Sequence, residues 1–422
     1  MKPFLSIGGS AIYEVNVRQY TEAGTLKAFQ LHLGRLKEMG IGILWFMPLT
    51  PISLKGRKGT LGSYYAASDY YSINPEFGTI TDFKDLVIEA HRLGLKVMID
   101  WVANHTGWDH TWTRSNPDFF IKNHAGQFCE RNGWEDVIDL NYQNHEMRLS
   151  MIEAMKWWIE TFGIDGFRCD MAMLVPLDFW DQARTTLDKV KPMIWLAECE
   201  DPTYLQVFDM MYGWEWMHLT KEVYRHQSGK YPLQDLYWRY IHRIHLNRNL
   251  LFTSNHDENS WNGTEYERYG DCAKAYAVLS ILLPGGLPLI YSGQELPTYH
   301  RLKFFDKDLI HWDTSIPVLN DFYLTLLQFR NSNKWLSDFG SPVIHFDLIK
   351  NPQILGFHVG KLNDQDYMVM VNLSHEAQSF QIENLSEGIY ENIFTKEKIN
   401  LMYERHGILE PFGYRIYSSD FK

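Results

Sequence analysis

The 422-residue sequence predicts an α/β protein built on a (β/α)8 barrel, with a short inserted domain and a C-terminal domain of antiparallel strands. Eight short apolar runs alternate with amphipathic helical stretches between residues 12 and 292, which is the pattern of such a barrel. After residue 336 the pattern changes to short alternating strands separated by turns, which indicates the second domain. A doubly wound open sheet is the alternative, but no G-x-G-x-x-G turn follows the first strand.

The predicted barrel strands are nearly continuous apolar runs, as expected for parallel strands that are covered on both faces. They span residues 12–17, 42–47, 96–100, 165–170, 193–198, 207–211, 250–254 and 288–292. Stretches such as TLKAFQLHLGRLKEMG and TDFKDLVIEAHRLG lie between them and end at glycine, as helices often do.

The third strand is followed by about forty residues before the next helical pattern begins. A loop of that length usually carries function or forms a small domain of its own. We therefore expect a barrel from residues 1–104 and 144–335, an inserted domain B from 105–143, and a C-terminal β-sandwich domain from 336–422.

Composition excludes several kinds of partner. The net charge of −12 argues against nucleic acid, and no basic run suits an anionic membrane surface. The four cysteines are too widely spaced for a zinc site or a disulfide framework. The opening MKPFLSIGGS lacks the apolar core of a signal peptide, so we expect a cytoplasmic protein; a secreted or periplasmic form whose signal peptide has been removed is the alternative.

Residues 166–170, GFRCD, place Arg168 and Asp170 on the same face of a short strand. The pair is either a buried structural ion pair or a carboxylate that the arginine keeps ionised and oriented for chemistry. Five residues do not decide between these interpretations, so the other strand ends must.

Polar side chains also follow other predicted strands at the carboxyl end, where (β/α)8 barrels carry their active sites. They are Asp100, Asn104 and His105 after the third strand, Glu198 after the fifth, and His256 and Asp257 after the seventh. Carboxylates and histidines around one barrel mouth fit either a divalent metal site or glycoside hydrolysis by a nucleophile and an acid. The histidine spacings match no zinc motif, which favours glycoside hydrolysis.

Six segments of the chain resemble signature segments of the α-amylase family of glycoside hydrolases (family 13). They are SYYAASDYYSINPEFGT (63–79), DWVANH (100–105), VIDLNY (137–142), GFRCD (166–170), WLAE (195–198) and FTSNHD (252–257). The resemblance implies that Asp170 is the nucleophile, Glu198 the acid/base and Asp257 the group that holds the sugar's 2- and 3-hydroxyls. It also implies that His105 and His256 hydrogen-bond the sugar, that Tyr65 stacks on it, and that Arg168 orients Asp170.

Two catalytic roles at one pH require two protonation states. We expect Arg168 to keep Asp170 ionised, and the neighbouring negative charges to raise the pKa of Glu198.

The resemblance implies retaining cleavage of α-1,4-glucosidic bonds in starch-derived glucans or maltooligosaccharides, through a covalent glycosyl-enzyme. An α-glucosidase, a cyclomaltodextrinase or a transglycosylase remains open within the family. A different class is a barrel that only binds carbohydrate or a partner, but the presence of all three acids argues against it.

The resemblance also allows a structural calcium ion, because Asn104 and Asp139 match positions that hold one in many relatives; no organic cofactor is expected. Calcium takes six to eight oxygen ligands, and the sequence offers these two residues. Met173 and Leu174 stand where many α-amylases have Lys-His, which contacts the next sugar and the calcium. This departure weakens the specific expectation of ordinary starch endo-hydrolysis.

Overall fold

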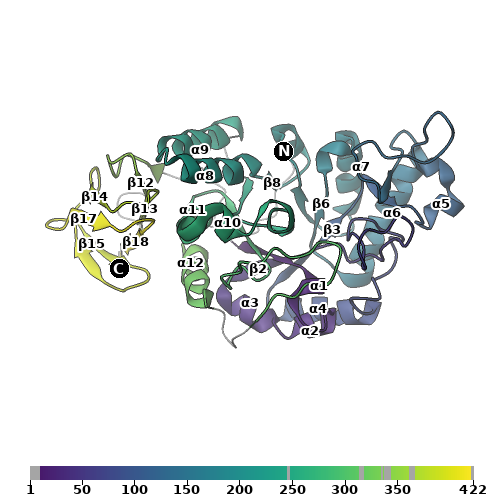
Figure 1. Ribbon diagram of the computed structural model, residues 1–422, viewed down its shortest axis with the longest axis horizontal. Coiled ribbons are helices and arrows are strands. Elements are labelled where there is room, and N and C mark those ends of the chain that lie inside the picture. Colours follow the sequence, from purple (N-terminus) through teal and green to yellow (C-terminus); the bar gives the residue numbers. More distant parts are fainter. Residues whose placement is uncertain are drawn as a thin grey trace.

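The computed structural model describes residues 10–244, 248–312, 318–333, 336, 344–360 and 366–419. Its centre is a closed barrel of eight parallel strands in the order β1-β10-β9-β8-β7-β6-β3-β2 (Figure 1). The strands are β1 (Ala11–Val15), β2 (Ile41–Phe46), β3 (Lys96–Trp101), β6 (Gly166–Cys169), β7 (Ile194–Ala197), β8 (Met210–Tyr212), β9 (Asn249–Leu251) and β10 (Leu287–Tyr291). All eight predicted strands are confirmed, and their ends differ from the prediction by at most three residues.

Side chains fill the barrel, so its interior is a packed core. Alternate residues of the strands point inward, and Ile12, Trp45, Met98 and Leu196 form part of one buried cluster there. Gly166 allows β6 and β7 to approach closely, because a Cβ at this position would lie 2.6 Å from the carbonyl oxygen of Ile194.

Helices surround the barrel and bury one face against it (Figure 1). They are α1 (Val17–Tyr20), α2 (Leu26–Gln30), α3 (Leu33–Met39), α4 (Ile80–Arg92), α6 (His145–Phe162), α7 (Leu177–Leu187), α8 (Trp214–His226), α9 (Tyr231–Ile244), α10 (Glu265–Tyr269), α11 (Ala273–Leu282) and α12 (Asn320–Ser332). Short turns of helix complete the loops: η2 (Ala172–Leu174), η3 (Pro202–Gln206), η4 (Glu258–Asn262) and η5 (Gly270–Cys272).

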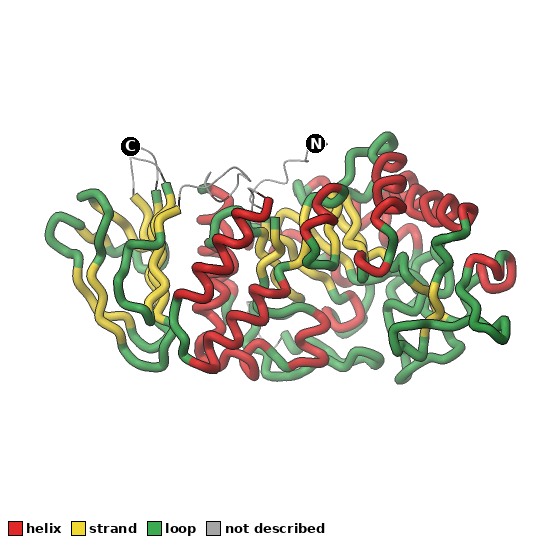
Figure 2. Tube along the Cα trace, turned by 90° about the horizontal axis from the view of Figure 1, so that it is seen from above, coloured by secondary structure: helices red, strands yellow, loops and turns green. Residues whose placement is uncertain are grey.

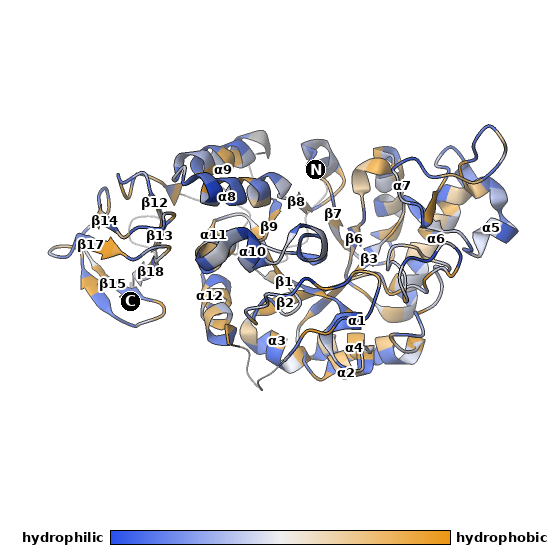
Figure 3. Ribbon diagram, viewed as in Figure 1, coloured by the Kyte–Doolittle hydropathy of each residue, from blue (hydrophilic) through white to orange (hydrophobic). Residues whose placement is uncertain are grey.

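The helix α4 shows why these stretches are helical. Thr79 and Asp82 form a capping box that satisfies the free amide groups at its first turn. Phe83, Leu86 and Val87 then recur on the face that is buried. Figure 3 shows hydrophilic and hydrophobic residues side by side along helices of this outer layer.

The long segment after β3 forms a small two-stranded antiparallel sheet of β4 (His105–Gly107) and β5 (Val137–Asp139). It also carries α5 (Trp112–Ser115) and η1 (Pro117–Phe119), at the right-hand end of Figure 1. These elements lie within the predicted insertion; the exact boundaries of the three domains stay predictions.

The C-terminal domain consists of two antiparallel sheets at the opposite end of the molecule (Figure 2). The larger has the order β11-β12-β13-β18-β15-β16 and the smaller pairs β14 with β17. Their bounds are β11 (Ile344–His345), β12 (Ile354–Val359), β13 (Tyr367–Asn372), β14 (Gln378–Gln381), β15 (Ile389–Asn392), β16 (Lys398–Asn400), β17 (His406–Leu409) and β18 (Tyr414–Ser419).

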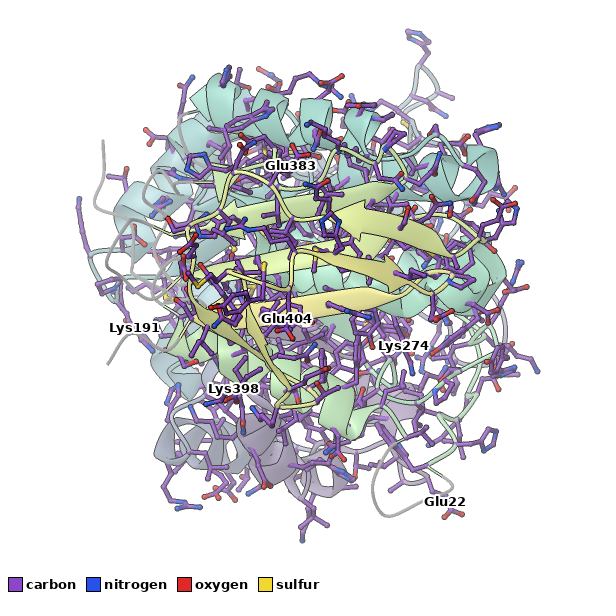
Figure 4. All side chains as sticks on the ribbon, turned by 90° about the vertical axis from the view of Figure 1, so that its left-hand side faces the viewer. Glu22, Lys191, Lys274, Glu383, Lys398 and Glu404 are labelled. Carbon is purple, nitrogen blue, oxygen red and sulfur yellow. The ribbon has the colours of Figure 1, made fainter. Side chains whose placement is uncertain are left out.

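Residues of both sheets share one buried cluster, which includes Met368 and Met370 of β13, Phe380 of β14 and Leu409 of β17. Lys398 and Glu404 are exposed on the surface of this domain (Figure 4). The predicted antiparallel C-terminal domain is confirmed. Across the described ranges, no helix is both long and apolar enough to cross a membrane.

Candidate active site

A cavity of about 520 Å³ opens at the carboxyl ends of the barrel strands. Six of the predicted site residues line it: Tyr65, His105, Asp170, Glu198, His256 and Asp257. They come from loops or strand ends after β2, β3, β6, β7 and β9, which lie far apart in the sequence. Barrel closure therefore brings together residues that the strand ends and the family resemblance predicted.

Arg168 lies below this cavity, fully buried, and is shared by three carboxylates. Its Nη1 donates hydrogen bonds of 2.9 Å to Asp100 Oδ1 and to Asp170 Oδ1. Its Nη2 lies 2.9 Å from Glu198 Oε2 as an ion pair, and its Nε donates to the Tyr212 hydroxyl at 3.2 Å. The register of the sheet explains the first contact, because Asp100 on β3 is paired with Arg168 on β6.

Asp170 and Glu198 differ in how their oxygens are held. Asp170 Oδ2 is buried, and no hydrogen-bond partner for it is found among the described residues. Glu198 Oε2 accepts a 2.7 Å hydrogen bond from the backbone N–H of Met171. Met171 adopts a left-handed conformation with φ of 40°, which is uncommon for a residue other than glycine and is concentrated at functional sites. One oxygen of Asp170 is thus free to react, while Glu198 is anchored.

Burial raises the pKa of both carboxyls to about 7, and the positive charge of Arg168 opposes the rise in each case. The expectation that Arg168 would hold Asp170 ionised and leave only the pKa of Glu198 raised is therefore wrong. The physical reason is that burial outweighs the charge of a single guanidinium, which is divided among Asp100, Asp170 and Glu198. The negative charge of Asp170 adds to the rise in the pKa of Glu198.

His256 lies between two carboxylates. Its Nδ1 pairs with Glu14 of β1, and its Nε2 lies 2.8 Å from the Tyr65 hydroxyl and 3.2 Å from Asp257 Oδ2. Burial alone would lower the pKa of His256, but Asp257 and Glu14 raise it well above its usual range. In return, the charge of His256 lowers the pKa of Asp257 against the effect of burial. His256 is therefore a cation that keeps Asp257 ionised.

Glu14 is a functional residue that the sequence prediction missed. It is fully buried in β1, and its Oε2 has no hydrogen-bond partner within the described ranges. The available signal was an acid inside the otherwise apolar strand IYEVNV, because an acid at such a position needs a buried partner.

The two neighbouring tyrosines of the loop after β2 have different places. Tyr65 lines the cavity, and its hydroxyl donates to Asp100 Oδ2 at 3.0 Å. Tyr64 instead donates to Asn16 and lies beneath the Arg18 guanidinium, 4.1 Å from the ring centroid. Only Tyr65 is placed to contact a sugar in the cavity.

His105 forms another part of the wall. Burial lowers its pKa to about 4, so it is neutral at physiological pH. Its Nδ1 lies 3.1 Å from the side-chain amide of Asn104, and its ring lies 5.3 Å from that of Trp134.

At the predicted calcium position, Asp139 Oδ1 is buried and has no hydrogen-bond partner among the described residues, but the other oxygen of this carboxylate is already paired. Asp139 is fully buried opposite His105 in the β4–β5 ladder, and its Oδ2 accepts a 2.6 Å hydrogen bond from Arg131 Nε. The guanidinium thus supplies the positive charge beside this carboxylate. The described residues contain no cluster of three or more acidic, histidine or cysteine ligands, and Asn104 and Asp139 alone fall short of six oxygens.

Comparison with known proteins agrees with this geometry. The sequence model of the family described as "Alpha amylase, catalytic domain" matches residues 13–125 and 119–316. The chain belongs to the α-amylase family of glycoside hydrolases. The chain resembles the crystal structure of an α-amylase from Lactobacillus plantarum, with 30% identity, a TM-score of 0.87 and coverage of 98% of this chain and 100% of that one.

Other relatives show how widely the family resemblance extends. A noncanonic maltogenic α-amylase from Thermotoga neapolitana superposes with a TM-score of 0.89 and 28% identity over 99% of this chain and all of that one. Among curated proteins, Alpha-amylase 3 of Dictyoglomus thermophilum is 30% identical over 44% of this chain and 42% of its own length. The chain spans less than half the length of that relative, and 49% of an α-amylase from Haloarcula japonica.

Proposed function

We propose that this protein is a retaining glycoside hydrolase that cleaves α-1,4-glucosidic bonds in maltooligosaccharides or other starch-derived glucans. The observation that carries the proposal is the arrangement of Asp170 and Glu198. They follow neighbouring parallel strands, share the Arg168 guanidinium and line one cavity, and one Asp170 oxygen has no partner among the described residues.

In the proposed first step, Asp170 Oδ2 attacks the anomeric carbon while Glu198 gives its proton to the departing glycosidic oxygen. The bond to the leaving sugar breaks, and a covalent glycosyl-enzyme forms. Glu198 then takes a proton from water, which attacks the same carbon and releases Asp170. The raised pKa of Glu198 suits this exchange, because an acid with a pKa near 7 can give and take a proton at neutral pH.

The remaining residues hold the sugar. Asp257, kept ionised by His256, accepts hydrogen bonds from two ring hydroxyls, and His256 and His105 add further polar contacts. Tyr65 offers its ring face to the sugar, as aromatic side chains in sugar-binding clefts do.

The site supports cleavage of a glycosidic bond more strongly than it supports water, rather than a second sugar, as the acceptor of the glycosyl group. Relatives include a 4-α-glucanotransferase and an α-glucosidase, so a sugar as well as water is a candidate acceptor for this site. A binding module without chemistry is the weaker alternative, since it has no need of an unpartnered buried carboxylate oxygen, which is costly to keep.

The partner that we propose is an oligo- or polysaccharide, with no nucleic acid and no membrane. The cytoplasmic location expected from the sequence stays a prediction, which fractionation of cells that produce the protein would check.

Incubation with maltotriose to maltoheptaose, with products resolved over time, tests the function. Proton NMR of the first product should show the α-anomer before mutarotation, because double displacement retains configuration. A β-anomer that appears first would exclude the covalent role of Asp170, and the absence of any cleavage would refute the hydrolase.

A further inference from the structure

The loop after β2 is bound to domain B along one side of the cavity. Lys58 Nζ lies 3.2 Å from Asp136 Oδ1, and both residues line the cavity. Further out, the backbone N–H groups of Leu54 and Lys55 donate to Asp109 Oδ2 at 3.0 and 3.1 Å. These contacts join the loop to the inserted segment.

The same loop is bound at its other end to the loop after β10. Leu61 N donates to Phe305 O at 3.0 Å, and Thr60 donates to Asp306 Oδ1 from its backbone N–H at 2.8 Å and from its hydroxyl at 2.6 Å. Gly59 has φ of +61°, and a Cβ there would lie 2.5 Å from Phe305 Cβ, so only glycine permits this approach.

A buried arginine fixes both loops from below. Arg18 is fully buried, pairs with Glu76 at 2.7 Å, and donates to Gly62 O at 3.1 Å and to Phe304 O at 3.3 Å. Domain B, the loop after β2 and the loop after β10 thus form one continuous wall around an arc of the barrel mouth. We call this the glycon wall.

The position of the wall relative to the reacting groups decides its effect. In the proposed mechanism the attacked sugar lies against Tyr65, while the leaving sugar lies on the side of Glu198. Phe304 belongs to the wall and lies next to Tyr65, with ring centroids 6.1 Å apart and planes within 13°. Met173 follows the nucleophile in the sequence, and 46% of its surface is exposed.

We infer that the cavity is a pocket closed on the glycon side, which takes the free non-reducing end of a maltooligosaccharide and releases a short product from it. This inference rests on the proposed function and specifies its substrate. A sugar chain that continued past the wall would have to displace the Lys58–Asp136 ion pair and the hydrogen bonds between Thr60 and Asp306. The inference places the leaving part of the chain outside this wall, so long and short leaving groups are both accepted.

The test compares two p-nitrophenyl maltoheptaosides, one with a free non-reducing end and one blocked there by a 4,6-O-ethylidene group, with fragments resolved by chromatography. We expect the free substrate to yield one short product of constant length, and the blocked one to be cleaved at least about 100-fold more slowly. Equal cleavage of both, with mixed fragment lengths, would overturn the closed pocket and leave the hydrolase intact. Failure to cleave either substrate would refute the proposed function itself.

A pair of variants tests the wall directly. Lys58→Ala removes a side chain that closes the wall, and should raise the blocked-to-free rate ratio about tenfold. Lys55→Ala is the matched control, because Lys55 belongs to the same loop but lies over Trp108, away from the cavity. If the folded Lys58→Ala protein has the same blocked-to-free rate ratio as the wild type, the role of Lys58 in the wall is contradicted.

Discussion

Replacing Asp170 with asparagine should abolish turnover and stabilise the folded protein at neutral pH. Asparagine keeps the shape of the side chain but neither attacks carbon nor ionises. Burial raises the pKa of Asp170 from 3.8 to about 7, despite the opposing charge of Arg168. A rise of this size means that ionisation of Asp170 lowers the free energy of unfolding by about 4 kcal/mol.

The sign of the pH dependence follows from proton linkage. The folded protein binds the Asp170 proton more tightly than the unfolded chain does, so the wild-type free energy of unfolding falls as pH rises from about 4 to about 7. Above pH 7 the folded wild-type protein carries the full free-energy cost of the buried, ionised Asp170 carboxylate. The uncharged asparagine does not have this cost. We therefore expect Asp170→Asn to be more stable than wild type by up to about 4 kcal/mol at pH 8, and by only about 1 kcal/mol near pH 4.5.

Urea unfolding followed by tryptophan fluorescence at the two pH values, with maltotriose turnover measured on the same samples, checks both parts. Asp118→Asn is the control: its side chain is 83% exposed and pairs with Lys122, so its effect should stay within about 0.5 kcal/mol. A variant that is less stable than wild type at pH 8 would refute the electrostatic reasoning. More than about a tenth of wild-type kcat, a loss of only ~1.4 kcal/mol of barrier, would refute the nucleophile.

Three further changes follow from the same site. Glu198→Gln should lower kcat on maltotriose about 10³-fold or more. The loss of kcat on α-maltosyl fluoride should be much smaller, because its leaving group needs no proton. Equal losses on the two substrates would contradict the role of Glu198 as the acid. Glu14→Gln removes one of the two carboxylates that raise the pKa of His256. When kcat/KM is measured from pH 5 to 9, its alkaline limb should therefore move to lower pH. An unchanged alkaline limb would exclude the coupling of Glu14 to His256. EDTA should leave the melting temperature unchanged. Arg131→Ala should lower the melting temperature, because Asp139 then stays buried without its cation. A fall in melting temperature with EDTA would contradict this account and indicate calcium at Asn104 and Asp139.

The barrel and its acids could be predicted because two local rules apply to them. Parallel strands covered on both faces are apolar along their length, which identified the eight strands. The carboxyl ends of those strands converge, which gathered Asp170, Glu198 and Asp257 around one cavity.

Contacts between distant segments could not be predicted in this way. Glu14 meets His256 across 242 residues of sequence, and only barrel closure brings their strands together. Arg168 reaches Asp100 through the β3–β6 register, so the sequence did not show that its charge is shared. Phe304 and Trp134 come from loops without a periodic pattern, although both line the cavity.

The measurement that tests the central claim most directly is the capture of the covalent intermediate. 5-Fluoro-α-D-glucosyl fluoride should form a glycosyl-enzyme that accumulates, because the fluorine at C5 slows its hydrolysis more than its formation. Mass spectrometry of peptides from the trapped protein should locate one fluoroglucosyl group, on Asp170, and Asp170→Asn should give none. A label on another carboxylate, or turnover with no covalent adduct and a β-configured product, would contradict the account.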